Sequence, residues 1–267
     1  MNKNVIFHYH TMILKMTASV ALLIFSLAIF PVVNSDAEIK LKKAEVIQDP
    51  SNKQNISGFI HIAFAWGDQL SPPQHLSRGF INLKEAMHRW TKIETIIDNH
   101  MFLSSAELLR MPFVYVTTDR SFELSEVEQK NLKKYFDGGG FMFLETATPT
   151  VENNQAGASL KQMLRDTLGA QARFAPLPNK HPLYHCFFDF DYGPPQGAEL
   201  SDSGGVYIRK QVYYLEGIWY KDRLIAVYSD KGYIVKWNDM TNNEPQLKIG
   251  VNMVIYSLIQ EGGITND

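Results

Sequence analysis

Short apolar runs alternate with helical patterns from residue 59 to residue 168, and this alternation limits the chain to few folds. Residues 59–66, 93–97, 113–116 and 141–144 have the length and apolar character of buried strands. Between and after them, apolar residues recur at helical spacing over 76–90, 124–136 and 160–168. Alternation this regular implies right-handed crossovers and a parallel sheet covered by helices on both faces. The sequence therefore predicts a flavodoxin-like α/β fold.

Short local signals indicate where the expected helices begin and end. Ser125 and Glu128 have the spacing of a capping box at the start of the second helix, and Ser77 is placed to cap the first. Gly169 follows the last apolar residue of the third helix, where a glycine commonly ends a helix. These signals support the assignment of the three helices.

The pattern changes after residue 172 to proline-rich turns and then to two β-rich stretches. Residues 213–220 and 224–229, joined at Lys221-Asp222, predict a β-hairpin. Residues 247–258 then predict a final packing helix. We expect one domain over 58–262, preceded at 38–57 by a polar linker without apolar periodicity.

The first 37 residues have the pattern of a signal peptide. Lys3 and Lys15 precede an uncharged stretch at 16–33, and Ser35 stands at a position that suits cleavage by signal peptidase. An uncleaved signal anchor is the alternative, because the stretch is near the lower limit for spanning a bilayer. The chain is thus expected to be exported, to the periplasm or the cell exterior, with this segment as its only membrane attachment.

Charge and cysteine content exclude several classes of function. The chain has 26 Lys and Arg against 28 Asp and Glu, and its only basic cluster is Lys40, Lys42 and Lys43. Nucleic-acid binding requires a clustered basic excess, so nucleic acid is not expected as a partner. The single cysteine, Cys186, excludes an intrachain disulfide and a multi-cysteine metal site.

Acidic residues follow three of the predicted strands and form the first candidate site. Asp68, Asp119 and Glu145 are expected at the carboxyl ends of parallel strands, where open α/β sheets bind ligands, and His75 lies in the long first loop. Such a group could bind a cation or carry out acid–base chemistry, and a divalent metal would suit it, although no motif requires a cofactor. Helix capping and turn formation are the structural alternative.

Further candidates lie near the carboxyl terminus. His181 and His185 are four residues apart, but Pro182 argues against the helix that would place them on one face, and capping is the expected role of His181. Cys186 stands in an aromatic stretch that favours a buried structural thiol. Trp237 belongs to a group of aromatic residues that suits either a stacking platform for a sugar or peptide, or ordinary packing. The other members are Tyr213, Tyr214, Trp219, Tyr220, Tyr228 and Tyr233.

Several fragments together resemble one bacterial family. They include Tyr115-Val116-Thr117, Gly138-Gly139-Gly140-Phe141, His181-Pro182-Leu183-Tyr184, Leu215-Glu216-Gly217-Ile218, Arg223-Leu224-Ile225-Ala226-Val227-Tyr228-Ser229 and Gly250-Val251-Asn252-Met253. The family is domain of unknown function 4159, and the match extends from about residue 59 to 258. This resemblance implies an architecture similar to class I glutamine amidotransferases, whose cysteine nucleophile sits on a sharp turn after a strand.

The turn that corresponds to this nucleophile position is Leu144-Glu145-Thr146-Ala147. It contains no cysteine or serine, and it lacks the glycines that let a nucleophile project from such a turn. Amidotransferase activity is therefore not expected.

These observations leave three hypotheses. The first is a non-catalytic exported domain that binds a ligand or partner around Asp68, His75, Asp119 and Glu145. The second is a hydrolase in which the same carboxylates hold a divalent metal that activates water. The third is a periplasmic accessory of a larger envelope assembly.

Overall fold

The computed structural model describes residues 43–149, 154–199 and 213–264. These residues belong to one compact unit, Lys42–Asp267. The predicted signal segment at 1–37 and residues 38–42 of the predicted linker lie outside the described residues. Within the described ranges, none of the helices has the length and apolar character needed to cross a membrane.

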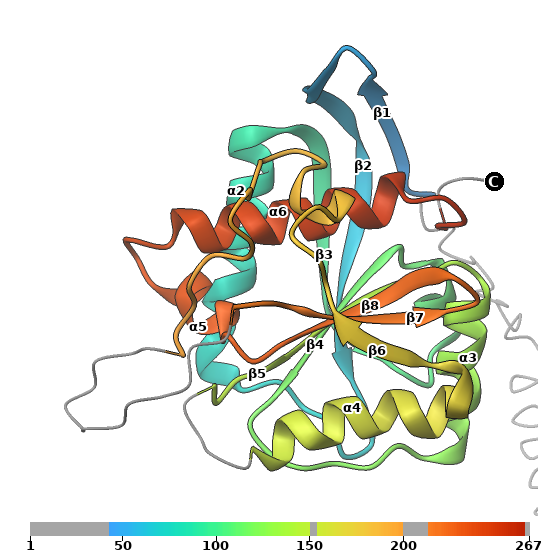
Figure 1. Cartoon of the computed structure of the whole chain (residues 1–267). Helices are drawn as coiled ribbons and strands as arrows, with labels where there is room; N and C mark the ends of the chain where they lie inside the picture. The colour runs from blue at the N-terminus through green and yellow to red at the C-terminus, as the bar shows by residue number, and fades with distance from the viewer. Residues whose placement is uncertain (1–42, 150–153, 200–212, 265–267) are drawn as a thin grey trace, which may run out of the picture. The chain divides into compact units, whose positions relative to one another are not determined.

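An eight-stranded sheet forms the centre of this unit (Figure 1). Five neighbouring strands are parallel, in the order β3, β2, β4, β5, β8. Numbered by their sequence among the parallel strands, they follow the order 2-1-3-4-5 of flavodoxin-like sheets, which confirms the predicted fold class. Their bounds are Asn52–Trp66 for β2, Lys92–Phe102 for β3, Phe113–Thr118 for β4, Phe141–Thr146 for β5 and Arg223–Ser229 for β8.

Two antiparallel strands extend the sheet beyond β8. Strand β7, Glu216–Tyr220, forms the predicted hairpin with β8, and β6, Arg173–Pro176, pairs with β7. Lys221 and Asp222 in the hairpin turn have φ values of 50° and 63°. A two-residue turn with both central φ values positive suits the twist of the strands it joins.

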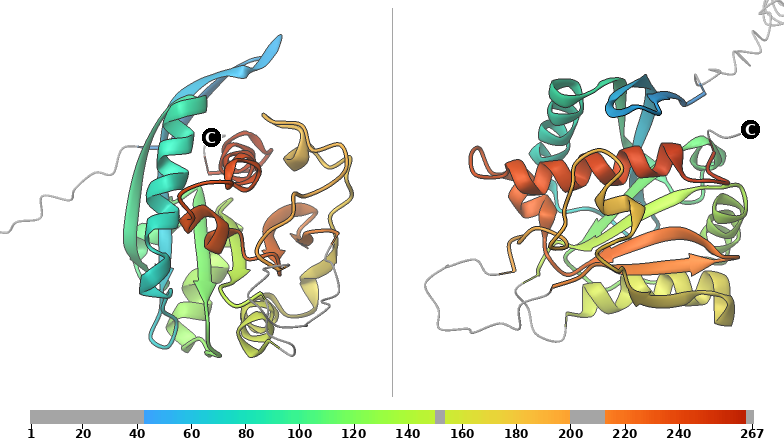
Figure 2. Two further views of the ribbon diagram at one scale, coloured as in Figure 1. Left: turned by 90° about the vertical axis from the view of Figure 1, so that its left-hand side faces the viewer. Right: turned by 45° about the horizontal axis from the view of Figure 1, so that its top comes forward.

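Helices cover both faces of the sheet, as the alternating pattern predicts (Figures 1 and 2). Helix α2 packs with α5 and α6 on one face, and α3 contacts α4 on the other. Their bounds are Arg78–Trp90 for α2, Glu126–Asp137 for α3, Gln155–Leu168 for α4, Tyr233–Asn238 for α5 and Glu244–Ile259 for α6. The described residues also form short 3₁₀ helices: η1 (Gln74–Leu76), η2 (Ala106–Arg110), η3 (Gly169–Gln171) and η4 (Pro182–Tyr184).

Aromatic side chains fill the space between the sheet and the α2 face. The buried ring of Tyr115 on β4 lies 5.1 Å from that of Phe80, 5.2 Å from that of Phe143 and 5.6 Å from that of Trp237. Burying large aromatic side chains is a major source of stability in a core of this kind. Strands β4 and β5 and the short helix α5 are therefore held together through Tyr115.

The helix ends agree with the expected signals in two places and differ in one. The capping box of α3 is formed, because Glu128 Oε2 accepts from the backbone N–H of Ser125 at 2.8 Å. Gly169 follows the last residue of α4 with a φ of 60°. Ser77 precedes α2, but its side chain caps no backbone N–H.

The predicted linker at 38–57 is wrong over most of its described part. Residues Glu45–Asp49 form β1, which pairs antiparallel with the first half of β2. Gly58 permits this pairing, because its φ is 152° and a Cβ there would lie 2.0 Å from the Glu45 carbonyl oxygen. The hairpin is largely polar and half-exposed, so it lacks the apolar periodicity on which the prediction depended.

Candidate functional site

The carboxyl ends of the parallel strands meet at one edge of the sheet. Strand β2 has β3 on one side and β4 on the other, so the direction of the crossovers changes between β2 and β4. In sheets of this topology, ligands bind outside the carboxyl ends at such a switch point. Asp68 follows β2, Asp119 follows β4, and Glu145 is the penultimate residue of β5.

The loop that carries Asp68 is tied to helix α3 by a buried carboxylate. Glu128 Oε1 accepts from the Asp68 backbone N–H at 2.9 Å, while Oε2 of the same carboxylate closes the capping box with Ser125. The capping box was predictable, whereas the bond to the neighbouring loop had no sequence signal. One buried side chain thus fixes the switch-point loop against the start of α3.

Three of the four predicted site residues are exposed at this edge. Asp68, His75 and Asp119 are all exposed residues, although the Asp119 side chain is partly covered. The Asp119 carboxylate accepts from Arg120 Nε at 3.2 Å, and among the described residues Asp68 and His75 make no side-chain hydrogen bond or ion pair. These groups can contact a ligand or partner without any rearrangement of the fold.

Glu145 differs from the other three because it is fully buried and saturated with hydrogen bonds. Its Oε1 accepts from the backbone N–H of Tyr233 at 2.7 Å. Its Oε2 accepts from the backbone N–H of Ile234 at 2.8 Å and from Tyr115 Oη at 2.9 Å. The carboxylate therefore caps the start of α5, where the first N–H groups of a helix have no partner within the helix.

Burial governs the protonation of this carboxyl group. Loss of water raises the pKa of Glu145 to about 7, although hydrogen bonds from the Ile234 and Tyr233 backbone, Ser229 and Tyr115 favour the charged form.

A buried ion pair lies just beyond the end of β8, where Lys231 Nζ is 2.6 Å from Glu199 Oε1. Sequence reasoning missed this pair, because no spacing links the two residues.

The predicted convergence of three carboxylates is therefore wrong. Among the described residues, no three His, Cys, Asp or Glu side chains are placed to hold a metal ion. The physical reason is the pleat of β5: Glu145 is two residues from Phe143, so its side chain points toward the same face, beneath α5, and not toward the exposed loops. The described residues therefore do not provide the three-carboxylate metal site on which the hypothesis of a metal-assisted hydrolase depended.

Thr146, the last residue of β5, is engaged in local hydrogen bonds. Thr146 is fully buried, and its hydroxyl accepts from the backbone N–H of Thr148 at 3.2 Å and from the Asn154 side chain. Asn154 also caps helix α4 by accepting from the Gly157 backbone N–H. The hydroxyl thus stabilises the turn that leads into α4.

His181 acts as a cap, as expected. Its Nδ1 accepts from the Leu183 backbone N–H at 3.2 Å at the start of η4. Burial lowers its pKa to about 4, so the ring is neutral near pH 7 and carries its proton on Nε2.

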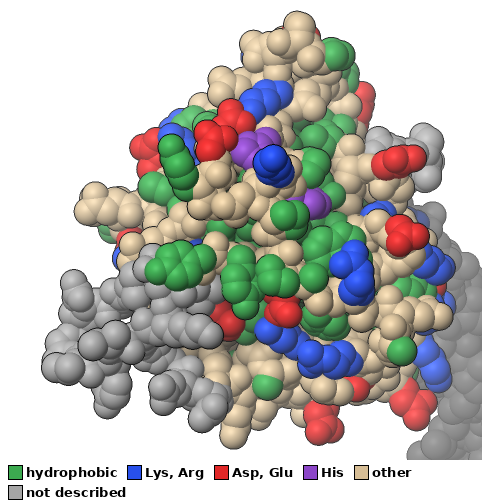
Figure 3. Space-filling view, viewed as in Figure 1, with side chains coloured by type: hydrophobic (Ala, Val, Ile, Leu, Met, Phe, Trp, Pro, Cys, Tyr) green, Lys and Arg blue, Asp and Glu red, His purple; other side chains and the backbone are tan. Residues whose placement is uncertain are grey.

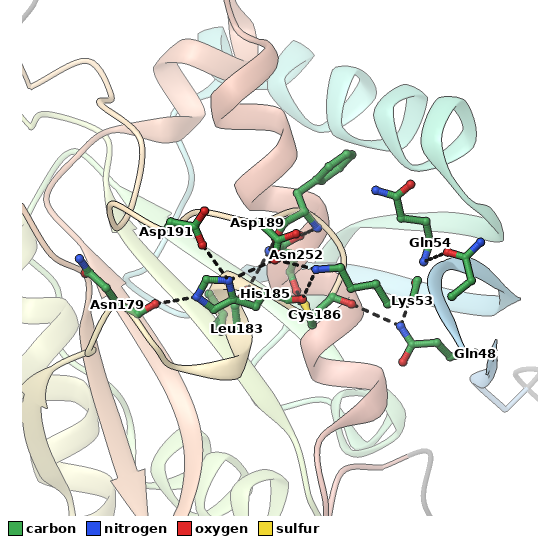
Figure 4. A network of polar contacts seen from close by, with 12 residues as sticks. Gln48, Lys53, Gln54, Asn179, Leu183, His185, Cys186, Asp189, Asp191 and Asn252 are labelled. Carbon is green, nitrogen blue, oxygen red and sulfur yellow. Dashed lines mark hydrogen bonds and ion pairs between the residues drawn. The ribbon is translucent and has the colours of Figure 1, made fainter. Parts of the chain in front are cut away.

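His185 and Cys186 belong to a polar network that ties the loop after η4 to two other elements (Figure 4). His185 Nε2 lies 2.8 Å from the Asn179 carbonyl, and the thiol of Cys186 donates to the Asn252 carbonyl on α6. Lys53 of the β1–β2 hairpin bonds to Asp189 at 2.6 Å. Cys186 is buried, as expected of a structural thiol, and this burial raises its pKa to about 12.

Trp237 is not part of an exposed platform. Its side chain is fully buried on α5, and its indole N–H donates to the Gln246 carbonyl at 2.7 Å. The related aromatic residues divide between the core and the surface. Tyr220, Tyr228 and Tyr233 are buried, Trp219 is half-buried, and Tyr213 and Tyr214 are exposed.

Fold and site together define a flavodoxin-like α/β domain whose strand ends carry exposed acidic loops and, at the end of β5, a buried glutamate. A family model described as domain of unknown function DUF4159 matches residues 72–258, more than half of the chain. The chain belongs to this family, as its sequence fragments indicate. A comparison with curated proteins finds no match.

Proposed function

We propose that the chain is a non-catalytic domain exported to the cell envelope, where it binds a partner through the exposed loops at the carboxyl edge of its sheet. Asp68, His75 and Asp119 provide the polar side chains of this surface, which we call the carboxyl rim. Such a domain would act as an accessory of a larger envelope assembly.

The burial of Glu145 is the observation that carries this proposal. The turn after β5 is where a related hydrolytic fold would place its nucleophile, yet this chain places there a carboxylate that is inaccessible to solvent and bonded to backbone and side-chain donors. A group that caps a helix and faces the core cannot reach a substrate outside the strand ends. Binding by the rim remains as the function that this edge can perform.

The rim is also built to present its side chains on a fixed backbone. Glu128 holds the Asp68 loop, and Thr118 Oγ1 accepts from the Arg120 backbone N–H at 3.3 Å directly after β4. Loops positioned by a rigid sheet are common sites of binding. The exposed carboxylates favour a partner that offers hydrogen-bond donors or basic groups.

Photo-crosslinking in cells tests the binding role. A photoreactive amino acid would replace Asp68 or Asp119 in the full chain, with Ile47 as the control position, because Ile47 is 63% exposed on β1 at the other end of β2. We expect a crosslinked product of the same mass from both rim positions and none from Ile47. Absence of a product at both rim positions, or an equal product from Ile47, would refute the proposal.

Export requires a separate test, because it depends on the sequence of the first 37 residues. A carboxyl-terminal fusion to a phosphatase that is active only outside the cytoplasm should be active with the full chain. Deletion of residues 16–33 should abolish that activity, since this is the uncharged stretch that the export machinery would recognise. Equal activity with and without the stretch would show that export does not depend on it.

A further inference from the structure

A groove of about 540 Å³ lies at the opposite edge of the sheet from the carboxyl rim. Its walls come from the end of α3, the β7–β8 turn, the end of α6 and the residue that caps η4. A volume between about 300 and 1,000 Å³ is typical of small-molecule sites. Figure 3 shows hydrophobic side chains gathered on the face that carries β6 and β7, with charged side chains around them.

Three aromatic side chains in this groove have polar groups that nothing in the described part of the chain satisfies. His181, Trp219 and Tyr256 all line it, and each is half-buried. The Nδ1 atom of His181 is already used as an acceptor, so its free Nε2 is a donor. The indole N–H of Trp219 and the hydroxyl of Tyr256 likewise make no hydrogen bond to described residues.

The position of Trp219 is fixed before any ligand arrives. Gly217, two residues earlier on β7, leaves space for the ring, since a Cβ at Gly217 would lie 2.4 Å from Trp219 Cη2. On the neighbouring strand, the Arg173 guanidinium lies 4.5 Å from the ring centroid. A binding group that is held in place loses little conformational entropy on binding.

Two charged side chains that line the groove, Asp137 and Arg223, are engaged by hydrogen bonds within the protein. Asp137 accepts from Lys221 Nζ at 2.8 Å, from Lys133 Nζ at 3.0 Å and from Tyr220 Oη at 3.1 Å. Arg223 donates from Nη1 and Nη2 to three backbone carbonyls at the end of α3. The basic groups Lys221 and Arg223 are thus engaged within the protein and are not available to pair with an anionic ligand.

We propose that this groove binds an uncharged saccharide. Aromatic rings contact the apolar C–H faces of a sugar ring, while their N–H and O–H groups donate to its hydroxyl oxygens. Asp222 and Glu261, which also line the groove, supply carboxylate acceptors for the sugar hydroxyl protons. The site is separate from the carboxyl rim, so either proposal can fail without the other.

Calorimetric titration of the full chain with two neutral oligosaccharides tests this site. The probes are the tetramer of N-acetylglucosamine, which represents an acetylated wall-type glycan, and maltotetraose, which lacks acetamido groups. Binding of the first alone assigns a wall-type glycan, and binding of both assigns a general saccharide site. If neither probe binds, the proposal is overturned.

Variants then locate the binding. Trp219→Ala should weaken it about tenfold or more, because a buried aromatic contact commonly dominates binding energy. Tyr192→Ala is the matched control, since Tyr192 is 99% exposed and lies outside the groove. Gly217→Ala should also weaken binding by displacing the Trp219 ring. Unchanged binding in Trp219→Ala, with a circular dichroism spectrum like that of the wild type, would contradict the assignment.

Discussion

Replacing Glu145 by glutamine should remove a pH dependence that burial imposes on the stability of the fold. The pKa of Glu145 is raised from 4.5 to about 7, chiefly by desolvation. The folded state therefore prefers the protonated form, and the associated stability is present below about pH 4.5 and lost as the pH rises through about 7. Glutamine has nearly the shape of the protonated acid but does not titrate.

The size of the effect follows from the pKa shift. One pKa unit corresponds to about 1.4 kcal/mol, so the full shift is worth roughly 3 kcal/mol. Between about pH 5 and pH 7, the wild type should lose roughly 2 kcal/mol of unfolding free energy relative to Glu145→Gln. Other titrating groups, including His181, are present in both proteins and cancel in this difference.

Urea unfolding at both pH values, followed by circular dichroism, measures the effect. The control is Glu126→Gln, because the Glu126 side chain is 87% exposed on α3 and should show no such dependence. If the difference between wild type and Glu145→Gln is the same at both pH values, the carboxyl group is not desolvated as described. Glu145 would then not be the buried helix cap described above.

Three further predictions concern buried polar contacts. Lys231→Met leaves Glu199 charged and unpaired, and should destabilise the fold by about 3–5 kcal/mol in chemical unfolding. The double change Lys231→Met with Glu199→Leu should recover much of this loss. Equal losses in the single and double variants would contradict the prediction. Asn252→Leu removes side-chain hydrogen bonds to the Leu183 carbonyl and to both backbone groups of Phe188. It should lower the melting temperature, with a loss of roughly 2–3 kcal/mol in the free energy of unfolding. An unchanged melting temperature would mean that these bonds do not stabilise the loop. Cys186 should react with a thiol reagent only at the rate of unfolding, and rapid labelling of the native chain would show an accessible thiol.

Periodicity was sufficient to predict the parallel part of the fold. Buried strands such as β4 and β5 are continuous apolar runs, and the helices between strands bury one side. Strands and helices therefore each have a strong hydrophobic pattern in the sequence. Strand β1 has no such pattern, because it is half-exposed and extends a polar hairpin. Helix α5 has only six residues, and its first N–H groups are capped by Glu145, which is far away in the sequence.

The candidate site was predictable in position but not in accessibility. The strand ends place Asp68, Asp119 and Glu145 at one edge, and the first two are exposed there. The two-residue repeat of β5 assigns Glu145 to the side of Phe143, but the unpredicted α5 is what buries it. The same helix removes Trp237 from the surface. The solvent accessibility of Glu145 and Trp237 thus depended on helix α5, a short element that the sequence pattern did not predict.

In the proposed function, the exposed rim acts as the binding surface and the buried carboxylate of Glu145 does not. The most direct test measures the yield of the crosslinked product from a photoreactive residue at Asp119 in two backgrounds. Asp68→Lys reverses a rim charge and should reduce the yield at least about fivefold, since like charges across an interface oppose binding. Glu145→Gln should leave the yield unchanged. Loss of the product in Glu145→Gln, with full yield in Asp68→Lys, would contradict the account.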